Sequence, residues 1–356
     1  MAGLFDPLQL GDIALGNRVV MAPMTRSRAG ADAVPTPIMV EYYRQRASAG
    51  LIVSEGIAPS RHGIGYCRTP GIYNEAQARV WREVTGAVHA AGGRIVAQLM
   101  HCGRVGSRLN KAPDAETVAP SAVRAAGRIF TDVAGMQEQD VPRALSLAEI
   151  RGVVDEYGAA TRLALAAGFD GVELHCTSGY LPMQFMATNS NLRTDAYGGA
   201  VQNRVRFVIE ALEAMTHEAR GRVGMRICPG NPFNDVLDPD PAVTYEALLA
   251  GSAHLQLAYL HVIRSPLREL DAFALARRHF GGPLVLNDGF DGATAAQALA
   301  GGRGAAVSFA RHYIGNPDLV HRLREGLPLA GFDAKSLYTP GQAGYIDYPC
   351  IDSGSV

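Results

Sequence analysis

Eight short apolar runs, each followed by a longer segment of helical pattern, constrain the fold of this chain more than any other feature of its sequence. Strands that alternate with helices predict a parallel sheet, and eight is the number of strands that closes a (β/α)8 barrel. A chain of 356 residues is long enough for one large barrel. The expected strands are residues 18–22, 51–55, 94–98, 169–175, 223–227, 259–262, 284–286 and 305–308.

A doubly wound open sheet is the main alternative. Such a sheet would place a glycine-rich turn, G-x-G-x-x-G, after its first strand. Ala22-Pro-Met-Thr25 follows the first expected strand instead, and the sequence contains no Gly-Lys pair of the kind that a P-loop needs. We therefore predict an α/β fold, a single TIM barrel that spans residues 1–356.

Helical segments are expected around residues 38–48, 81–91 and 204–216. Ser146 and Glu149 have the spacing of a capping box, which indicates the start of a further helix before the fourth strand.

Two segments do not belong to the strand and helix repeat. Residues 102–145 follow the third strand and contain strand-like pieces at 118–120 and 128–131. An insertion this long is typical of a lid over the barrel mouth. The tail, residues 335–356, is rich in tyrosine, glycine and proline, and we expect it to pack on the barrel.

Charge and composition exclude several functions. A net charge of −1 gives no electrostatic reason to bind nucleic acid or an anionic membrane surface. No run of 18 apolar residues occurs, and the N-terminus lacks the basic and apolar regions of a signal peptide. The five cysteines are scattered without C-x-x-C spacing, so neither a zinc ribbon nor an iron–sulfur site is expected. These features predict a cytoplasmic protein.

The segment Gly168–Tyr180 is a strand that leads into a polar loop. Side chains alternate along a strand, so Glu173 and His175 share one face while Val172 and Leu174 share the other. A buried strand that ends in a histidine is a common place for chemistry in α/β proteins.

The C-terminal ends of all eight barrel strands meet on one face, so their residues can be considered as one site. They are mainly neutral hydrogen-bonding groups, without the clustered carboxylates of a metal-dependent barrel. Glu55, Glu173 and Asp288 could ligate a metal, but we expect Glu173 to pair with a buried arginine and predict no metal site. The strand-end residues are Pro23 to Thr25, Glu55, Gly56, Gln98, His175, Tyr180, Arg226, Gly289 and Arg311.

The last two strands favour a phosphate site. Their ends carry Asn287-Asp-Gly289 and Ala310-Arg311, and barrels often bind phosphate in these loops through backbone N–H groups and a basic side chain. Schiff-base chemistry is disfavoured, because the only lysines, Lys111 and Lys335, lie in the insertion and the tail.

Several motifs resemble the old yellow enzyme family of FMN-dependent ene-reductases over nearly the whole chain. Each motif alone is weak evidence, but their number and order are specific. They are Leu4–Pro7, Gly16–Arg28, Tyr42–Gly50, Gln98–Arg104, Gly168–Tyr180, Asn189–Arg204, Ile314–Leu319 and Gly344–Pro349.

The resemblance implies a TIM barrel that holds FMN non-covalently at its C-terminal face. It implies flavin-ring contacts from three residues after the first strand and from two on the next strands, an arginine beside flavin N1 and O2, and a phosphate site. By position these residues are Pro23, Met24 and Thr25, then Gly56 and Gln98, then Arg226, and finally Gly289, Ala310 and Arg311.

The implied reaction is a ping-pong reduction of an activated C=C bond. NADPH or NADH delivers a hydride to FMN and leaves, and an α,β-unsaturated carbonyl or nitro compound then accepts it. By resemblance Tyr180 is the proton donor, while His175 and Ser178 hold the substrate carbonyl. Tyr66, Phe233, Asn234 and Tyr345 match positions near the substrate.

The sequence also departs from the family pattern. Ser178 stands where asparagine or histidine is usual, Met100 stands where an aromatic residue is common, and Asp288 and Ala310 replace small residues of the phosphate segment. Loss of an oxyanion-type donor can cost on the order of 100-fold in rate. Three alternatives stay open at this point: a specialised flavin enzyme that oxidises or isomerises its substrate, a flavin-free metal-dependent lyase or hydrolase, and a non-catalytic binding module. The natural substrate, the choice of NADPH or NADH and the oligomeric state are not encoded in these patterns.

Overall fold

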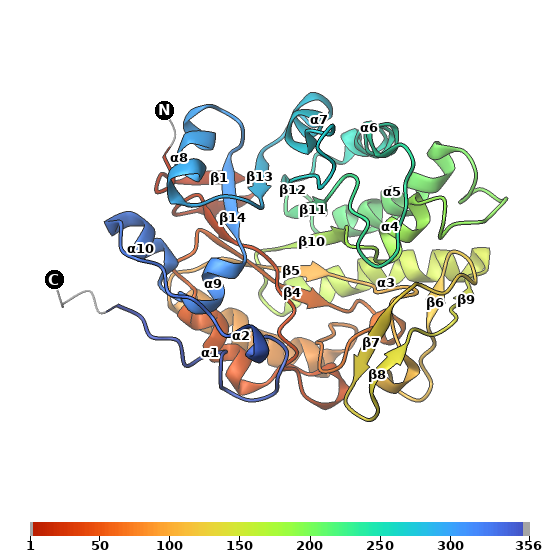
Figure 1. Ribbon diagram of the computed structural model, residues 1–356, viewed down its shortest axis with the longest axis horizontal. Helices are drawn as coiled ribbons and strands as arrows, with labels where there is room; N and C mark the ends of the chain where they lie inside the picture. Colours follow the sequence, from red (N-terminus) through yellow and green to blue (C-terminus); the bar gives the residue numbers. More distant parts are fainter. Residues whose placement is uncertain (1–2, 352–356) are drawn as a thin grey trace.

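A closed barrel of eight parallel strands forms the centre of the computed structural model, which describes residues 3–351 (Figure 1). All eight predicted strands are confirmed, with ends that differ by at most two residues, so the fold class is confirmed. The strands, in their order around the barrel, are β3 (Val19–Met21), β4 (Leu51–Ile57), β5 (Ile95–Leu99), β10 (Gly171–Cys176), β11 (Val223–Ile227), β12 (Tyr259–Ile263), β13 (Leu284–Asn287) and β14 (Ala306–Phe309).

Helices surround the barrel (Figure 1). The predicted capping box is confirmed, since Ser146 Oγ accepts from the Glu149 N–H and Glu149 Oε2 accepts from the Ser146 N–H. The helices are α1 (Pro37–Gln45), α2 (Glu75–Ala90), α3 (Leu147–Ala166), α4 (Leu181–Met186), α5 (Val201–Glu218), α6 (Pro241–Ser252), α7 (Ala272–His279), α8 (Gly292–Ala300), α9 (Arg311–Gly315) and α10 (Leu319–Glu325).

The α2 helix begins six residues before the segment expected from sequence. Asn74 precedes it with an extended backbone, and its side chain accepts a hydrogen bond from the Gln77 N–H. An asparagine in this position satisfies one of the free N–H groups of the first turn, so the helix starts there rather than at the buried Trp81.

An antiparallel hairpin that the sequence analysis did not predict packs against one end of the barrel interior. Its strands are β1 (Leu8–Leu10) and β2 (Ile13–Leu15), joined through Gly11 at φ +54°. Leu10, Ile13 and Leu15 are buried in one cluster with inward-facing valines of β3, β4, β5 and β13. Burying each such side chain contributes about 1.5–3 kcal/mol. The barrel interior is therefore apolar at this end, which leaves its polar side chains at the other.

The insertion contains two small pairs of strands. β6 (Val118–Ala119) pairs with β9 (Arg143–Ala144), and β7 (Arg128–Thr131) forms an antiparallel hairpin with β8 (Gly135–Glu138). Both strand-like pieces predicted within residues 102–145 are therefore strands. In Figure 1 the β7–β8 hairpin extends away from the barrel sheet.

The tail packs on the barrel through two buried arginines that follow β3. Arg26 donates to the carbonyls of Leu337 and Gly344, and Arg28 donates to four carbonyls of the same segment. The ring of Tyr345 stacks on Tyr42 of α1 at a centroid distance of 4.1 Å. The tail is thus held as predicted as far as residue 351, and residues 352–356 of that prediction lie outside the described residues.

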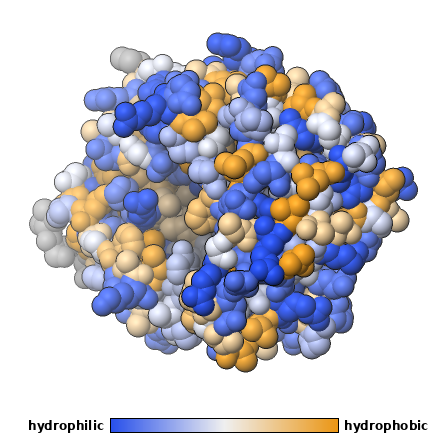
Figure 2. Space-filling model, turned by 45° about the vertical axis from the view of Figure 1, so that its right-hand side comes forward, coloured by the Kyte–Doolittle hydropathy of each residue, from blue (hydrophilic) through white to orange (hydrophobic). Residues whose placement is uncertain are grey.

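Within residues 3–351, no helix has the length and apolar character that crossing a membrane would require. Figure 2 shows one face of the molecule, where hydrophobic side chains are scattered among hydrophilic ones and the surface is hollowed.

Candidate active site

A cavity of about 770 Å³ opens at the C-terminal ends of the barrel strands. Its lining combines residues from the barrel, from the β7–β8 hairpin and from the tail. The barrel and its loops contribute Pro23, Thr25, Ser27, Tyr66, Cys67, Arg68, His175, Tyr180 and Phe233, the hairpin region contributes Arg128, Ile129, Phe130, Asp132 and Met136, and the tail contributes Lys335, Tyr338, Thr339 and Pro340.

Polar side chains that point into the barrel form a network below this cavity. Glu173 and Gln98 are register partners on β10 and β5, and Gln98 Nε2 donates to Glu173 Oε1 at 2.8 Å. His261 of β12 lies 2.9 Å from Glu173 Oε2 through Nδ1 and 2.7 Å from Ser308 Oγ through Nε2. All four side chains are buried, and polar groups placed this deep need such partners.

The prediction that Glu173 pairs with a buried arginine is wrong as far as hydrogen bonds are concerned. Gln98 and His261 make them, although Arg226 acts on the carboxylate through its charge. Burial opposes ionisation of Glu173, but the His261 ring, Arg226 and Gln98 together hold its pKa below the ordinary value. Burial lowers the pKa of His261, so the network contains an ionised carboxylate and a neutral imidazole.

Arg226 supplies the positive charge of the site. It lies on β11 beside His175, is 7% exposed, and donates from Nη2 to Asn287 Oδ1 at 2.8 Å. Its Nε and Nη1 are buried without a hydrogen-bond partner. Buried guanidinium nitrogens that lack a hydrogen-bond partner reduce the stability of a folded protein. They fit a group with acceptor atoms and negative charge, as the predicted contact with flavin N1 and O2 requires.

Further residues of the predicted flavin contacts lie after β3 and on β4. Pro23 and Thr25 line the cavity, and Met24 is half-buried against the core. Gly56 lies opposite Gln98, next to a β-bulge, and a Cβ there would approach the Met100 sulfur to 2.5 Å. The glycine therefore keeps the backbone close to its neighbour.

The predicted phosphate residues lie at neighbouring strand ends. Asn287 and Ser308 are register partners, which brings Gly289 after β13 close to Ala310 and Arg311 after β14. Gly289 has φ +74° and Asp288 has φ +76°, so the chain turns sharply here. Arg311 is exposed at the start of α9.

Tyr180, His175 and Tyr66 meet at the inner end of the cavity. The Tyr180 hydroxyl donates to the Tyr66 hydroxyl at 3.2 Å, and the His175 ring packs edge-on against Tyr180 at 4.8 Å. Burial raises the pKa of Tyr180 well above its ordinary value and that of Tyr66 to about 12. Burial, with Arg226 next, lowers the pKa of His175 to about 3. The site therefore holds two protonated phenols and a neutral imidazole at neutral pH.

Ser178 does not line the cavity with its neighbours His175 and Tyr180. Its backbone is left-handed, at φ +58°, and its carbonyl accepts a hydrogen bond of 2.8 Å from Asn234 Nδ2. Asn234 also lies 3.5 Å from the Tyr66 hydroxyl, and Phe233 lines the cavity although it is 58% exposed. The structure thus brings Phe233 and Asn234 to the site. Ser178 is linked to the site only by the hydrogen bond from Asn234 to its backbone carbonyl.

Tyr345 lies elsewhere than the predicted substrate position. It is fully buried, it stacks on Tyr42, and the Arg28 guanidinium lies 4.7 Å from its ring centroid. It is absent from the cavity lining, where Tyr338 of the same tail is present. The physical reason is that buried Arg26 and Arg28 donate hydrogen bonds to the carbonyls of Gly344 and Ala343, which holds the adjacent Tyr345 in the protein interior.

Sequence reasoning missed the outer wall of the cavity. Arg68 joins its parts: Nε donates to the Ser27 carbonyl, Nη2 to the Tyr338 carbonyl, and Nη1 bonds Asp132 beyond β7. The length of the insertion indicated a lid, but no local pattern specified which of its side chains face inward. Asn287 was also missed as a partner of Arg226, although it was seen in the phosphate segment.

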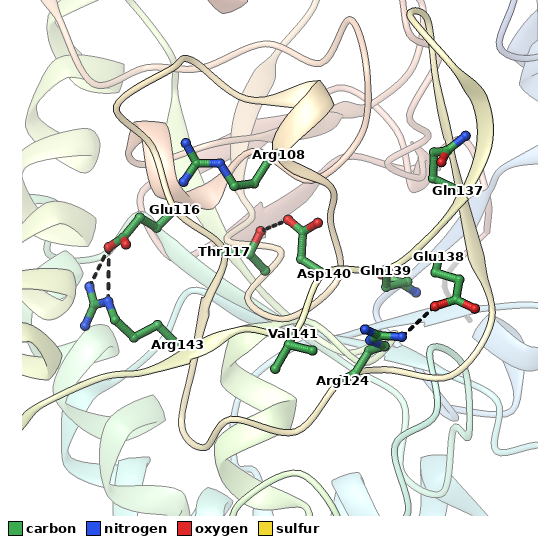
Figure 3. A pocket seen from close by; sticks show the side chains of 10 residues that line it. All are labelled: Arg108, Glu116, Thr117, Arg124, Gln137, Glu138, Gln139, Asp140, Val141 and Arg143. Atoms are coloured by element: carbon green, nitrogen blue, oxygen red, sulfur yellow. Dashed lines mark hydrogen bonds and ion pairs between the residues drawn. The ribbon is translucent and has the colours of Figure 1, made fainter.

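A second hollow, of about 640 Å³, lies within the insertion and is drawn in Figure 3. Two ion pairs lie in it: Arg143 bonds Glu116 at 2.8 Å, and Arg124 bonds Glu138 at 2.6 Å. Arg108 donates to the Pro113 carbonyl and Asp140 accepts from the Thr117 hydroxyl, so the polar groups of this hollow bond mainly within the insertion. The cavity above the barrel strands is the candidate active site.

Among residues 3–351, no group of three or more His, Cys, Asp or Glu side chains is arranged to hold a metal ion.

Comparison with known proteins identifies the family of this chain. Residues 3–330 match the family described as NADH:flavin oxidoreductase / NADH oxidase. A protein of Leishmania infantum described as a probable flavin mononucleotide-dependent alkene reductase is 41% identical over 355 residues, which cover 97% of each chain. Chanoclavine-I aldehyde reductase of Penicillium roqueforti is 39% identical over 365 residues, 98% of this chain and 96% of the other.

Solved structures are similar over the same length. Morphinone reductase in complex with tetrahydroNAD has a TM-score of 0.95 at 41% identity, covering 100% of this chain and 99% of the other. The old yellow enzyme homologue from Zymomonas mobilis has a TM-score of 0.94 at 40% identity, covering 98% and 100%. The chain therefore belongs to the old yellow enzyme family of FMN-dependent NAD(P)H oxidoreductases.

Proposed function

We propose that this protein is an ene-reductase, which uses NADPH or NADH to reduce activated C=C bonds of enones, enals, maleimides or nitroalkenes in a ping-pong reaction. The single observation that carries the proposal is the meeting of Tyr180, His175 and Tyr66 at the inner end of one cavity. This arrangement places a proton donor, Tyr180, beside a neutral hydrogen-bond donor, His175.

FMN would be held by Pro23, Met24 and Thr25, by Gly56, Gln98 and Arg226, and at its phosphate by Gly289, Ala310 and Arg311. When bound, FMN takes a hydride from the nicotinamide and supplies it to the β-carbon of the alkene. The unpartnered nitrogens of Arg226 support this assignment. They are buried N–H donors of a guanidinium group, which keeps its positive charge at neutral pH.

His175 is proposed to bind the substrate carbonyl or nitro oxygen. Burial lowers the pKa of this ring to about 3, so the imidazole is neutral at neutral pH and can donate through an N–H group. A neutral donor polarises the alkene without a change of charge in the buried site.

Tyr180 is proposed to give its Oη proton to the α-carbon of the substrate. The raised pKa keeps this proton on the oxygen until the substrate accepts it. The Tyr66 hydroxyl, 3.2 Å away and itself bonded to Asn234, can donate to the tyrosinate oxygen that remains.

The test is an anaerobic absorbance spectrum of the purified protein, recorded before and after NADPH and then after cyclohexenone. Flavin bands that bleach with NADPH and return with the enone support the proposal. Bands that stay bleached would reject enone reduction while retaining the flavin, and a protein that cannot be loaded with FMN would contradict the cofactor assignment.

A specialised enzyme of the same fold, which oxidises or isomerises its substrate, is the second candidate. Ser178 favours it, because a short side chain outside the cavity lining weakens the hold on a carbonyl. Asparagine tolerates the left-handed backbone at this position, so Ser178→Asn should fold. We expect the variant to reduce cyclohexenone about tenfold faster. An unchanged rate would remove the reason for this candidate.

A further inference from the structure

A fully buried carboxylate lies below the proposed FMN site and takes no part in the proposed reaction. Glu173 is the inward-facing residue that precedes His175 on β10. It accepts hydrogen bonds from Gln98 on one oxygen and from His261 on the other. Burying an ionised group is costly, so a carboxylate kept here needs an explanation beyond stability.

The first consequence of Glu173 concerns the amide of Gln98. A carboxylate can only accept hydrogen bonds, so the nitrogen of the Gln98 amide must point to Glu173, as it does at 2.8 Å. The amide oxygen is then the end that remains for a ligand. An amide oxygen presented in this way accepts a hydrogen bond from an imide N–H, which the flavin ring carries at N3.

The second consequence concerns charge. His261 Nδ1 is the donor toward Glu173, because a carboxylate only accepts, and Nε2 lies 2.7 Å from Ser308 Oγ, whose hydroxyl can serve as its donor. The imidazole can therefore be satisfied in its neutral form. The ionised Glu173 is therefore the counter-charge of Arg226, whose guanidinium it stabilises from one strand away. In a buried site such charges are weakly screened.

We propose that Glu173 is a positioning residue of the cofactor site, which orients the Gln98 amide and lowers the reduction potential of bound FMN by offsetting the charge of Arg226. FMN gains negative charge on reduction, and an uncompensated arginine beside it favours the reduced form. The inference rests on the FMN site of the proposed function, but it does not depend on the reduction of any alkene.

The experiment is spectroscopic potentiometry of the FMN-loaded protein against a reference dye, with FMN affinity measured by fluorescence. Glu173→Gln keeps the shape and removes the charge. We expect the ratio of reduced to oxidised FMN at a fixed solution potential to rise about tenfold, which is about 30 mV for two electrons. Glu173→Asp keeps the charge but shortens the side chain. Its potential should match the wild type, while FMN binding weakens about tenfold because the contact to Gln98 is lost.

Ser308→Ala is the matched control, because it removes the far end of the network without changing its charge, and its potential should equal that of the wild type. A Glu173→Gln potential equal to the wild-type value would overturn the charge role. Unchanged FMN affinity in both Glu173 variants would overturn the orientation of Gln98.

Asn287→Asp keeps the proposal testable if Glu173→Gln does not fold. It places a second carboxylate on Arg226 and should lower the reduced-to-oxidised ratio about tenfold. An unchanged ratio there would also reject the charge role. An enzyme whose FMN potential responds as expected but which reduces no enone would keep this inference and reject only the proposed substrate class.

Discussion

The floor and the outer wall of the active-site cavity are built in different ways. The floor consists of buried polar side chains at the ends of barrel strands, where neighbouring strands fix every position by register. The wall consists of the β7–β8 hairpin and the tail, with half-exposed Phe130, Met136 and Tyr338, joined by Arg68. A rigid floor suits chemistry that needs fixed distances, and an exposed wall suits the choice and entry of ligands.

The largest effect is expected at the floor, from Tyr180→Phe. Removal of the hydroxyl takes away the proposed proton donor but leaves the ring that packs on His175. Stopped-flow measurement should show reoxidation by cyclohexenone slowed about 100-fold, with reduction by NADPH unchanged. Tyr66→Phe is the comparison variant and should slow the same step less. If reoxidation by the enone proceeds at the wild-type rate in Tyr180→Phe, another group is the acid.

A second test uses buried histidines, namely His175 and His261 of the floor and His101, which follows β5. His101, His175 and His261 all have pKa values lowered by burial, so they stay neutral in the folded protein but gain protons in the unfolded chain below pH 6.5. Stability from these groups is therefore lost as the pH falls. Glu55 acts in the opposite direction, because burial raises its pKa to about 7 and the folded state binds its proton first.

The net expectation is a loss of about 2 kcal/mol in the free energy of unfolding between pH 6.5 and 5.5. Urea titrations of the FMN-loaded protein at these two pH values measure it. A free energy of unfolding that is equal or higher at pH 5.5 would mean that the histidines are not held neutral.

The wall should act on the reductant rather than on the chemistry. Arg128 and Lys335 line the cavity from the hairpin and the tail, and the phosphates of a nicotinamide dinucleotide attract such charges. The double variant Arg128→Ala/Lys335→Ala should raise the NADPH dissociation constant about tenfold, without slowing reoxidation by cyclohexenone. Arg124→Ala, a neighbouring arginine that pairs with Glu138 away from the cavity, should change neither quantity. Equal NADPH affinities in all three proteins would exclude a role of these charges.

The smallest effect is expected from Arg68→Ala, which loosens the wall without touching the floor. The loss of its bonds to Ser27, Asp132 and Tyr338 should raise the KM for the enone about threefold and speed proteolysis of the tail, with kcat nearly unchanged. Arg61→Ala provides the control, because Arg61 pairs with Asp114 on the surface. A large loss of kcat would mean that wall and floor are coupled.

The floor could be predicted from sequence in so far as the alternation of side chains along a strand determines which of them share a face. Alternation along one strand put Glu173 and His175 on the same face, Gln98 was expected at the end of its own strand, and the closed barrel brought them together. The partner of Glu173 was not predictable, because it depends on which inward residues face one another across the barrel, and no local pattern records that distance. Family resemblance supplied the roles of Tyr180 and Arg226, which stay proposals.

The wall was far less predictable. The length of the insertion at residues 102–145 indicated a lid. Which side chains of its hairpin face the cavity depends on how the hairpin packs near the tail. Tyr345 illustrates the problem: its motif suggested a place near the substrate, whereas the contacts of Arg26 and Arg28 hold that part of the tail against α1. Such contacts join residues more than 300 positions apart, beyond the reach of any periodicity.

The arginine contacts to the tail also have a consequence for synthesis in the cell. Arg26 and Arg28 are translated more than 300 residues before residues 336–344, which carry their acceptor carbonyls. Until then the two arginines have only their near neighbours as protein partners, the Tyr42 hydroxyl for Arg26 and the Arg26 carbonyl for Arg28. The cavity therefore acquires the part of its outer boundary that the tail supplies only after residues 335–340 have been translated.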